Sequence, residues 1–372
     1  MTARDNLIAA LRRTDPQWTP FEIGGFNREG FELFRERTGS TDPERYFDAP
    51  SPAKHVFPGG SRLDIRDRFL PFHDLPPENY RDELPPHPSE GLFTINEWGT
   101  AFVVGSHPAY DYFVPPARIV GARSAAEVDS LPVPDFEASY RYDHVDEEIR
   151  GLQGGGVAAI GSMTCTIFER AWQIRGLDQL LMDFLENEEV ADLLLDRETR
   201  HAKARAQRFA AAGADILYLG DDVGMQDRLI MSVQVWDRFL RDRMAQIIDA
   251  AREAKPDILV MYHSDGYIDP LVPRLIDIGV DVLDPVQPEC MDPAAIKHTY
   301  GDRLSFHGTL GIQHTLPFGT PEEVRRETRE RIETVGKGGG LFLAPTHSIA
   351  PEVPYENIHA FVAAAREFGG QR

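Results

Sequence analysis

The chain has 372 residues, of which 42% are hydrophobic, 27% charged and 10% aromatic, and this composition is that of a folded globular protein and not of a disordered chain or a fibre. Its 39 Lys and Arg residues stand against 60 Asp and Glu residues, so the formal net charge is −21. Such a charge repels phosphate backbones and anionic membrane surfaces, which argues against nucleic-acid binding as the main task.

The cysteine content and the amino terminus favour a cytoplasmic protein. The two cysteines, Cys165 and Cys290, are far apart and form no CxxC pair, so no disulfide framework is expected. The first residues, MTARDNLIAALRRTDPQW, predict a short amphipathic helix and lack the continuous apolar stretch of a signal peptide. No later window approaches the roughly 20 uninterrupted apolar residues that a membrane span needs. We therefore expect no membrane partner.

The first 150 residues are rich in proline, which predicts ordered loops and edge strands with few long helices. Two short apolar pieces stand out within them. Residues 19–26 (TPFEIGGF) predict a strand, and residues 92–105 predict one arm of a hairpin that returns through YDYFVPPARIV. We interpret this part as the first strands of a larger fold together with loops over its mouth, and expect residues 1–372 to form a single domain.

From about residue 155 the sequence alternates short apolar runs with amphipathic stretches, so residues 151–372 predict regular βα units. One of the helices begins at a capping box made by Thr320 and Glu323, with Pro321 at its first position. Six runs predict strands: residues 157–164, 214–222, 257–266, 280–289, 304–311 and 340–347.

The strand count predicts a (β/α)8 TIM barrel with an N-terminal extension. Strands that are each followed by a helix need parallel pairing with crossover helices. Adding the two strands of the first hundred residues brings the six to about eight, the number that closes such a barrel. A doubly wound open sheet is the rival fold, but no GxGxxG follows a first strand.

Polar residues follow nearly every predicted strand, and in a barrel the carboxyl ends of the strands build the active site. The side chains found there carry carboxylates, imidazoles, amides and thiols, together with one indole and one hydroxyl: Glu97, Trp98, Thr164, Cys165, Asp221, Asp222, His263, Asp265, Gln287, Glu289, Cys290, His307, Gln313 and His347.

Four of these residues are the candidates for a metal site: His263, Asp265, His347 and Cys290. His263 leaves the run ILVMY with Asp265 two positions on, and His347 follows LFLAP in the same way. Together with Cys290 they offer a site that leaves one position open for substrate. The alternative for each histidine is a hydrogen bond to a neighbouring strand end, and the long-range spacing does not decide between the two.

The other candidates have equally open alternatives. Asp222 with Asp221 offers a base or a cation binder, or else a cap for the next helix. Glu97 beside Trp98 is a carboxylate with an apolar neighbour, or else a solvated edge residue. Cys165 at a helix start is more often a small buried side chain than a reactive thiol, and Cys290 is the better thiol candidate.

Several stretches resemble the uroporphyrinogen decarboxylase superfamily, which also contains zinc-dependent methyltransferases that act on methylated corrinoid proteins. The matching stretches are INEWGTAF, FERAWQIRG, MYHSDGYIDPLVPRLIDIGVDVLDPVQPE, FHGTLGIQHTLPFGTPEEVRRE and LFLAPTHSIAPEVPYENI. The resemblance implies a barrel with a cleft at the strand carboxyl ends and, often, a homodimer.

The sequence departs from the family patterns at two places. The first departure argues against a true decarboxylase, and the second changes the residues that would bind the metal in the methyltransferase branch. The arginine-rich RQAGR signature of the decarboxylases corresponds here to FEIGGFNREG. The methyltransferases bind zinc through His-x-Cys and a later cysteine. Here the matching positions are His263, Asp265 and His347, and these harder ligands broaden the choice of divalent metal.

The leading hypothesis is metal-assisted methyl transfer linked to a corrinoid protein. His263, His347, Asp265 and Cys290 are the predicted ligands, with zinc the favoured ion, and Asp222, Glu97 and His263 the predicted catalytic residues. A small-molecule substrate is expected to contact Trp98, Asp221, Gln287, His307 and Gln313. The alternatives are a metal-free decarboxylase of a small acid and a non-catalytic binding subunit of a methyl-transfer complex.

Overall fold

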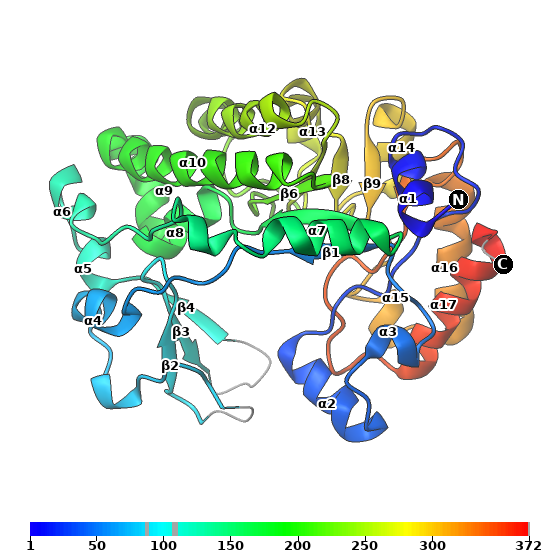
Figure 1. The fold of residues 1–372 in the computed structure, drawn as a ribbon, viewed down its shortest axis with the longest axis horizontal. Coiled ribbons are helices and arrows are strands. Elements are labelled where there is room, and N and C mark those ends of the chain that lie inside the picture. The colour runs from blue at the N-terminus through cyan, green and yellow to red at the C-terminus, as the bar shows by residue number, and fades with distance from the viewer. Residues whose placement is uncertain (86–88, 106–110, 371–372) are drawn as a thin grey trace.

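The computed structural model describes residues 1–85, 89–105 and 111–370. Within them the strands form two sheets, one of seven strands and one of three. Figure 1 shows the helices α10 (Glu188–Ala211) and α12 (Asp242–Ala254) along one side of the molecule, with the small sheet at the opposite side. Among the described residues, none of the helices combines the length and the hydropathy that a bilayer span requires.

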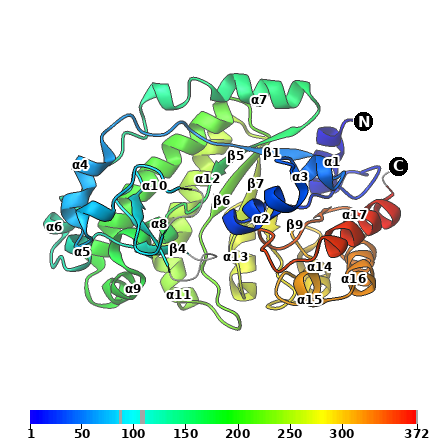
Figure 2. The same ribbon diagram turned by 90° about the horizontal axis from the view of Figure 1, so that it is seen from below.

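The larger sheet is entirely parallel and follows chain order, as the βα alternation predicts. Its strands are β1 (Ala53–Val56), β5 (Ala158–Met163), β6 (Ile216–Gly220), β7 (Leu259–His263), β8 (Val282–Asp284), β9 (Ser305–His307) and β10 (Leu341–Phe342). The six predicted strands after residue 155 are thus confirmed, although each is shorter than its apolar run. Figure 2 shows this sheet between the helices that connect its strands.

The sheet curls into a barrel-like shape, but the described residues contain seven parallel strands and not eight. The predicted strand 19–26 exists only as isolated parallel bridges, Phe21 to Leu343 and Phe26 to Ile349. Next to the first bridge, Glu22 accepts a hydrogen bond from Ser51 Oγ, just before β1. This segment therefore contacts both edges of the curled sheet without forming a regular strand.

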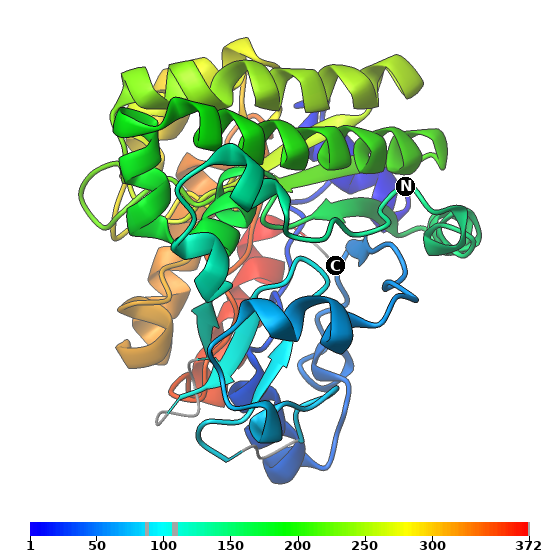
Figure 3. The same ribbon diagram turned by 90° about the vertical axis from the view of Figure 1, so that its left-hand side faces the viewer.

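The prediction that the hairpin supplies a barrel strand was wrong. Strands β2 (Phe93–Ile95), β3 (Ala101–Val104) and β4 (Asp111–Val114) form a separate antiparallel sheet outside the parallel one. Figure 3 shows this small sheet below the long helices. The barrel strand that precedes β5 is β1, a run of four residues between prolines, too short to give a periodic signal.

The helices flank the parallel sheet or form the N-terminal extension. The capping box predicted at Thr320 and Glu323 is confirmed at the start of α16. Besides α10 and α12, the helices of the described residues are α1 (Ala3–Leu11), α2 (Arg28–Thr38), α3 (Pro43–Tyr46), α4 (Ile65–Phe69), α5 (Ala117–Val120), α6 (Ala125–Asp129), α7 (Val145–Gly154), α8 (Phe168–Arg175), α9 (Leu177–Glu186), α11 (Val233–Trp236), α13 (Val272–Asp277), α14 (Pro293–Tyr300), α15 (Thr315–Phe318), α16 (Pro321–Thr334) and α17 (Tyr355–Gly369). Four short 3-10 helices are η1 (Leu70–Phe72), η2 (Pro77–Asn79), η3 (Ser139–Arg141) and η5 (Asp269–Leu271), and η4 (Asp237–Arg241) is a π-helical segment.

The interior of the curled sheet is closed at its amino-terminal end by α1. Leu7 and Leu11 of this helix pack on alternate strand residues such as Ile160, Ile216 and Met261. Alternation follows from the strand period of two, which turns every second side chain inward. Because this end is filled by aliphatic side chains, the open space inside the sheet lies toward the carboxyl ends of the strands.

A glycine in β5 lets α10 approach the sheet. An added Cβ at Gly161 would lie 2.6 Å from both Cβ and Cγ of Phe209 on α10. We expect Gly161→Ala to lower the free energy of unfolding by about 1–3 kcal/mol, measured by urea denaturation. Gly151→Ala in α7 is the control, since nothing lies within 4 Å of its Cβ, and it should stabilise by about 0.5–1 kcal/mol. Equal effects at the two positions would contradict this packing.

Candidate active site

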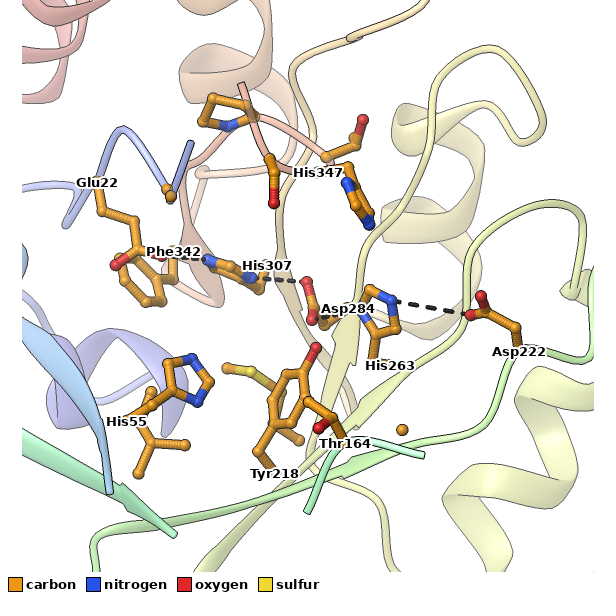
Figure 4. A pocket seen from close by; sticks show the side chains of 18 of the residues that line it. Glu22, His55, Thr164, Tyr218, Asp222, His263, Asp284, His307, Phe342 and His347 are labelled. Carbon is orange, nitrogen blue, oxygen red and sulfur yellow. Dashed lines mark hydrogen bonds and ion pairs between the residues drawn. The ribbon is translucent and has the colours of Figure 1, made fainter. Parts of the chain in front are cut away.

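A pocket of about 350 Å³ lies at the carboxyl ends of the parallel strands. Its walls come from the segment before α2 and from the ends of all seven parallel strands or the residues after them, as expected for a barrel-like fold. Figure 4 shows the polar side chains that point into it. The lining residues are Glu22, Gly24, Gly25, His55, Ile160, Thr164, Cys165, Glu169, Tyr218, Gly220, Asp222, Met261, His263, Asp284, His307, Phe342, Pro345, Thr346, His347 and Ser348.

Asp284, the last residue of β8, lies between two histidines of the neighbouring strands (Figure 4). Its Oδ2 is 2.9 Å from Nδ1 of His263, and its Oδ1 is 2.6 Å from Nδ1 of His307. Burial opposes ionisation of Asp284, but the two imidazoles hold the pKa of this carboxyl well below its usual range. Burial also opposes charge on the histidines, yet Asp284 raises the pKa of each to about 10.

The same chain of charges continues to Glu22 on the far side of His307. Nε2 of His307 is 3.4 Å from Oε1 of Glu22, whose other oxygen accepts the hydrogen bond from Ser51. Burial would raise the pKa of Glu22, but His307 and Ser51 lower it overall. His307 is thus held from both ring nitrogens by carboxylates, which fixes its orientation and its proton.

A second group of ligand atoms surrounds the free nitrogen of His263. Its Nε2 lies 3.8 Å from Oδ1 of Asp222 and 4.0 Å from Oδ1 of Asp265. The backbone N–H of Asp265 donates to Asp222 Oδ1 at 2.8 Å, which holds the Asp222 carboxylate against the main chain of Asp265. His347 lies next to this group, with Nε2 3.8 Å from Oδ2 of Asp265 and its ring centre 6.5 Å from that of His263.

The donor set of Asp222, His263 and Asp265 fits a divalent metal ion. Ligand atoms of the three residues all lie within 4.8 Å of one another, and two carboxylates with an imidazole suit a divalent cation. Asp284 occupies Nδ1 of His263 and leaves Nε2 free to face both carboxylates. A carboxylate behind the imidazole is the usual support of a metal-binding histidine, because it fixes the tautomer.

The wall beside Asp222 carries a protonatable carboxyl group and a thiol. Burial, with the nearby charge of Asp222, raises the pKa of Glu169 to about 7. Cys165 adopts a positive φ of 54° and lies close to Gln173, whose Nε2 donates to Sγ at 3.4 Å. Burial raises the pKa of the Cys165 thiol to about 12, so it remains protonated at neutral pH and is a poor nucleophile.

Of the residues singled out from the sequence, the structure brings Asp222, His263, Asp265, His307 and His347 together, with Thr164 and Cys165 on the same pocket. Two others lie behind the wall and hold loops. Asp221 is buried and accepts hydrogen bonds from the backbone N–H groups of Ile167 and Glu169 at the start of α8. Gln287 Oε1 accepts the backbone N–H of Gly266.

Five other candidates do not line the pocket: Glu97, Trp98, Glu289, Cys290 and Gln313. Glu289 accepts the backbone N–H of Gln313. Glu97 lies in the turn between β2 and β3 and forms two 2.7 Å hydrogen bonds with Arg141, and Trp98 lies under Arg170. Gln313 pairs with Gln226 on an exposed loop. Burial raises the pKa of Cys290 to about 11, so this thiol also stays protonated.

Five titratable residues of the pocket were missed from the sequence: Glu22, His55, Glu169, Tyr218 and Asp284. Asp284 was hidden because the apolar run 280–289 predicts a longer strand, whereas β8 ends at Asp284 and the following residues leave the pocket. Every second side chain of β6 faces the interior of the sheet, and this periodicity could have identified Tyr218, whose hydroxyl faces Asp284. Nothing local distinguishes Glu22, since its partners are brought near only by folding.

Comparison with known proteins agrees with the fold. A family model described as uroporphyrinogen decarboxylase (URO-D) matches residues 109–368, which is more than half of the chain. The chain is 29% identical over 220 residues to methylcobamide:CoM methyltransferase MtaA of Methanosarcina barkeri, covering 59% of this chain and 61% of that protein. It is 26% identical over 231 residues to methylated-thiol–coenzyme M methyltransferase of Methanosarcina mazei, covering 59% and 56%. The match thus spans about three fifths of these relatives' length.

Two further matches widen the comparison. Uroporphyrinogen decarboxylase of Pseudomonas fluorescens is 24% identical over 258 residues, covering 66% of this chain and 69% of that protein. Among solved structures, a methyltransferase from Methanosarcina mazei superposes with a TM-score of 0.62 at 19% identity and covers 99% of both chains. The latter likeness concerns the fold alone. On the match of the family model, the chain belongs to the uroporphyrinogen decarboxylase (URO-D) family.

Proposed function

We propose that the chain is a methyltransferase in which a divalent metal ion, zinc in the first instance, is held by Asp222, His263 and Asp265. The observation that carries the proposal is the grouping of these three ligands around Nε2 of His263. The names of the relatives MtaA and methylated-thiol–coenzyme M methyltransferase support methyl transfer, and the former supports a corrinoid carried by a partner protein.

When bound, the metal lowers the pKa of a coordinated acceptor group and presents it as an anion for methyl transfer. The protein's own residues orient this chemistry. Asp284 holds Nδ1 of His263, so that the ring keeps one tautomer. His347 is half exposed, lines the pocket and lies beside Asp265, where its ring would contact the acceptor.

Glu169 takes the place proposed for Glu97 as the residue that manages protons. Its carboxyl lines the pocket near Asp222, and its pKa of about 7 suits a group that accepts the proton of the acceptor and then releases it to solvent. Tyr218, Met261 and Phe342 line the same pocket and exclude water from its inner part. A volume of about 350 Å³ suits a small molecule.

A metal-free decarboxylase is the second candidate, favoured by one observation. Without a metal, His263 and His307 both carry protons at neutral pH, since the pKa of each is about 10. Two imidazolium groups in one pocket would bind a substrate carboxylate or donate a proton to the carbanion left after loss of carbon dioxide. Uroporphyrinogen decarboxylases are among the relatives.

Metal analysis and two activity assays separate the candidates. We expect the purified wild-type protein, dialysed against Zn²⁺, to retain about one equivalent of metal, and His263→Ala or Asp265→Ala to lose it. His347→Ala should cause a smaller loss, because its ring lies outside the three-ligand group. Demethylation of methylcobalamin with a thiol acceptor, followed by absorbance, should fall in parallel.

His144→Ala is the matched control, since His144 does not line the pocket, is exposed and contacts the carbonyl of Phe57. It should retain both metal and activity. A wild-type protein that binds no divalent metal in dialysis would remove the methyltransferase proposal. Release of carbon dioxide from small acids by that metal-free protein would then support the decarboxylase.

A further inference from the structure

Two arginines and two aromatic rings form a cluster outside the pocket, between α8, α10 and the turn that joins β2 to β3. Cζ of Arg170 lies 3.8 Å from the centre of the Trp98 ring. Cζ of Arg205 lies 6.0 Å from the same ring and 5.8 Å from that of Phe136. The two rings are 4.8 Å apart, so both guanidinium groups contact one aromatic pair.

Both guanidinium groups are buried without a carboxylate partner. Arg170 and Arg205 are each only 7% exposed. Arg170 donates from Nη1 to Oε1 of Gln173 at 2.6 Å, and in the described part of the chain Arg205 has no hydrogen-bond acceptor. Arg141, their neighbour, differs because Glu97 neutralises it through two hydrogen bonds.

The terminal nitrogens of Arg205 are the accessible part of this cluster. Nε of Arg170 and Nε of Arg205 are enclosed without a partner, whereas the two Nη atoms of Arg205 and Nη2 of Arg170 are not enclosed. Burial lowers the pKa of Arg205 to about 10, so its side chain is still charged at neutral pH. Within the described residues, these donors therefore have no hydrogen-bond partner and keep a small exposed surface.

The local charge is opposite to that of the whole protein. Three guanidinium groups, those of Arg141, Arg170 and Arg205, lie around the rings of Trp98 and Phe136 in a chain of formal charge −21. The neighbouring carboxylates of Glu97 and Asp135 both pair with Arg141, and among the described residues neither forms an ion pair with Arg170 or Arg205. An unpaired cation away from water is unfavourable, and contact with aromatic faces offsets only part of that cost. An oxyanion with two acceptor oxygens would supply both the missing charge and the missing hydrogen bonds.

We propose that Arg170 and Arg205 form an anion site for a small molecule that carries a carboxylate or a phosphate group. The oxygens of the anion accept hydrogen bonds from the accessible Nη atoms, next to the ring of Trp98. Gln173 connects this site to the pocket, since it accepts from Arg170 and donates to Sγ of Cys165. The site does not depend on the proposed methyl transfer or on a metal ion.

Isothermal titration of the full chain with inorganic phosphate and, separately, with succinate tests the proposal at 0.15 M NaCl, where nonspecific attraction is screened. We expect saturable binding of at least one of the two anions to the wild-type protein. Its affinity should fall roughly ten-fold or more in Arg205→Met and in Arg170→Met, because each loses a charged donor. Preference for phosphate or for succinate identifies the group.

Arg208→Met is the matched control, since Arg208 lies one turn along α10, is exposed and contacts the ring of Tyr142. It removes the same charge and should leave the affinity unchanged, as should His263→Ala in the pocket. Thermal unfolding without anion checks folding, and Arg205→Met should be no less stable than the wild type. Absence of binding to the wild type, or equal affinity in Arg205→Met, overturns the proposal.

Discussion

Asp284→Asn is expected to weaken metal binding about 10- to 100-fold and to reduce methyl transfer to a similar extent, because this carboxylate holds Nδ1 of His263, the imidazole proposed as a metal ligand. Asn keeps the size of the side chain but removes the charge that orders Nδ1 of both His263 and His307. The free energy of unfolding should also fall, by about 1–3 kcal/mol, because two hydrogen bonds to a charged group are weakened. Competition with a chromogenic chelator measures the affinity, and urea denaturation measures the stability.

The same substitution at the other end of the strand serves as the control. Asp281 immediately precedes β8 and accepts hydrogen bonds from Arg252 at 3.0 Å and from the backbone N–H of Val260 at 2.8 Å. Asp281→Asn should therefore cost stability as well, but leave the metal affinity unchanged. If Asp284→Asn bound metal as tightly as the wild type, the support assigned to Asp284 would be wrong.

In the absence of metal, the stability of the protein is expected to fall steeply as the pH rises from about 7.5 to 9. The pKa values of His263 and His307 are about 10 in the folded chain, above the value of about 6.5 for an unfolded histidine. Each histidine thus contributes stability that is fully present below pH 6.5 and is lost as the pH approaches 10. The slope is at most about 1.4 kcal/mol per pH unit for each histidine.

The lower part of this pH range separates the histidines from Glu169 and the two cysteines. The pKa of Glu169 is about 7 in the folded chain, so its effect on stability is nearly complete by pH 8. The folded pKa values of the two cysteines are about 12 and 11, so these thiols add to the slope only once the unfolded thiols ionise, near pH 8.5. His307→Gln should flatten the slope by about the contribution of one proton. Urea denaturation at several pH values, with chelator present, measures this slope. His144→Gln should follow the wild type, and an equally steep slope in His307→Gln would contradict the proton assigned to this ring.

The sequence predicted the regular half of the fold better than the irregular half, for a physical reason. Strands β5 to β10 lie within apolar runs, because a parallel strand covered on both faces must be apolar along its length. The region before residue 150 has no such signal. There β1 has only four residues, and the segment around Phe21 makes only isolated bridges. The more apolar hairpin was therefore wrongly predicted to supply a strand of the barrel.

The site residues likewise fall into those whose position the sequence predicted correctly and those that it misplaced. Asp222, His263, Asp265, His307 and His347 could be identified because each follows an apolar run, and parallel strands end at a common edge. Glu97 and Trp98 also follow an apolar run, but that run is the edge of a separate antiparallel sheet. Local sequence does not reveal to which sheet a short strand belongs.

Hydrophobic periodicity and strand length are local properties, so the parallel βα order after residue 155 and the polar character of the strand ends could be predicted. Three contacts became visible only in the folded chain: Asp284 bridges His263 and His307, Glu22 reaches His307 across the gap in the sheet, and Arg205 lies against Trp98 with no carboxylate paired to it among the described residues. Each of these contacts joins residues that are distant in the chain, and such contacts depend on strand register and curvature, which are set by packing of the whole molecule.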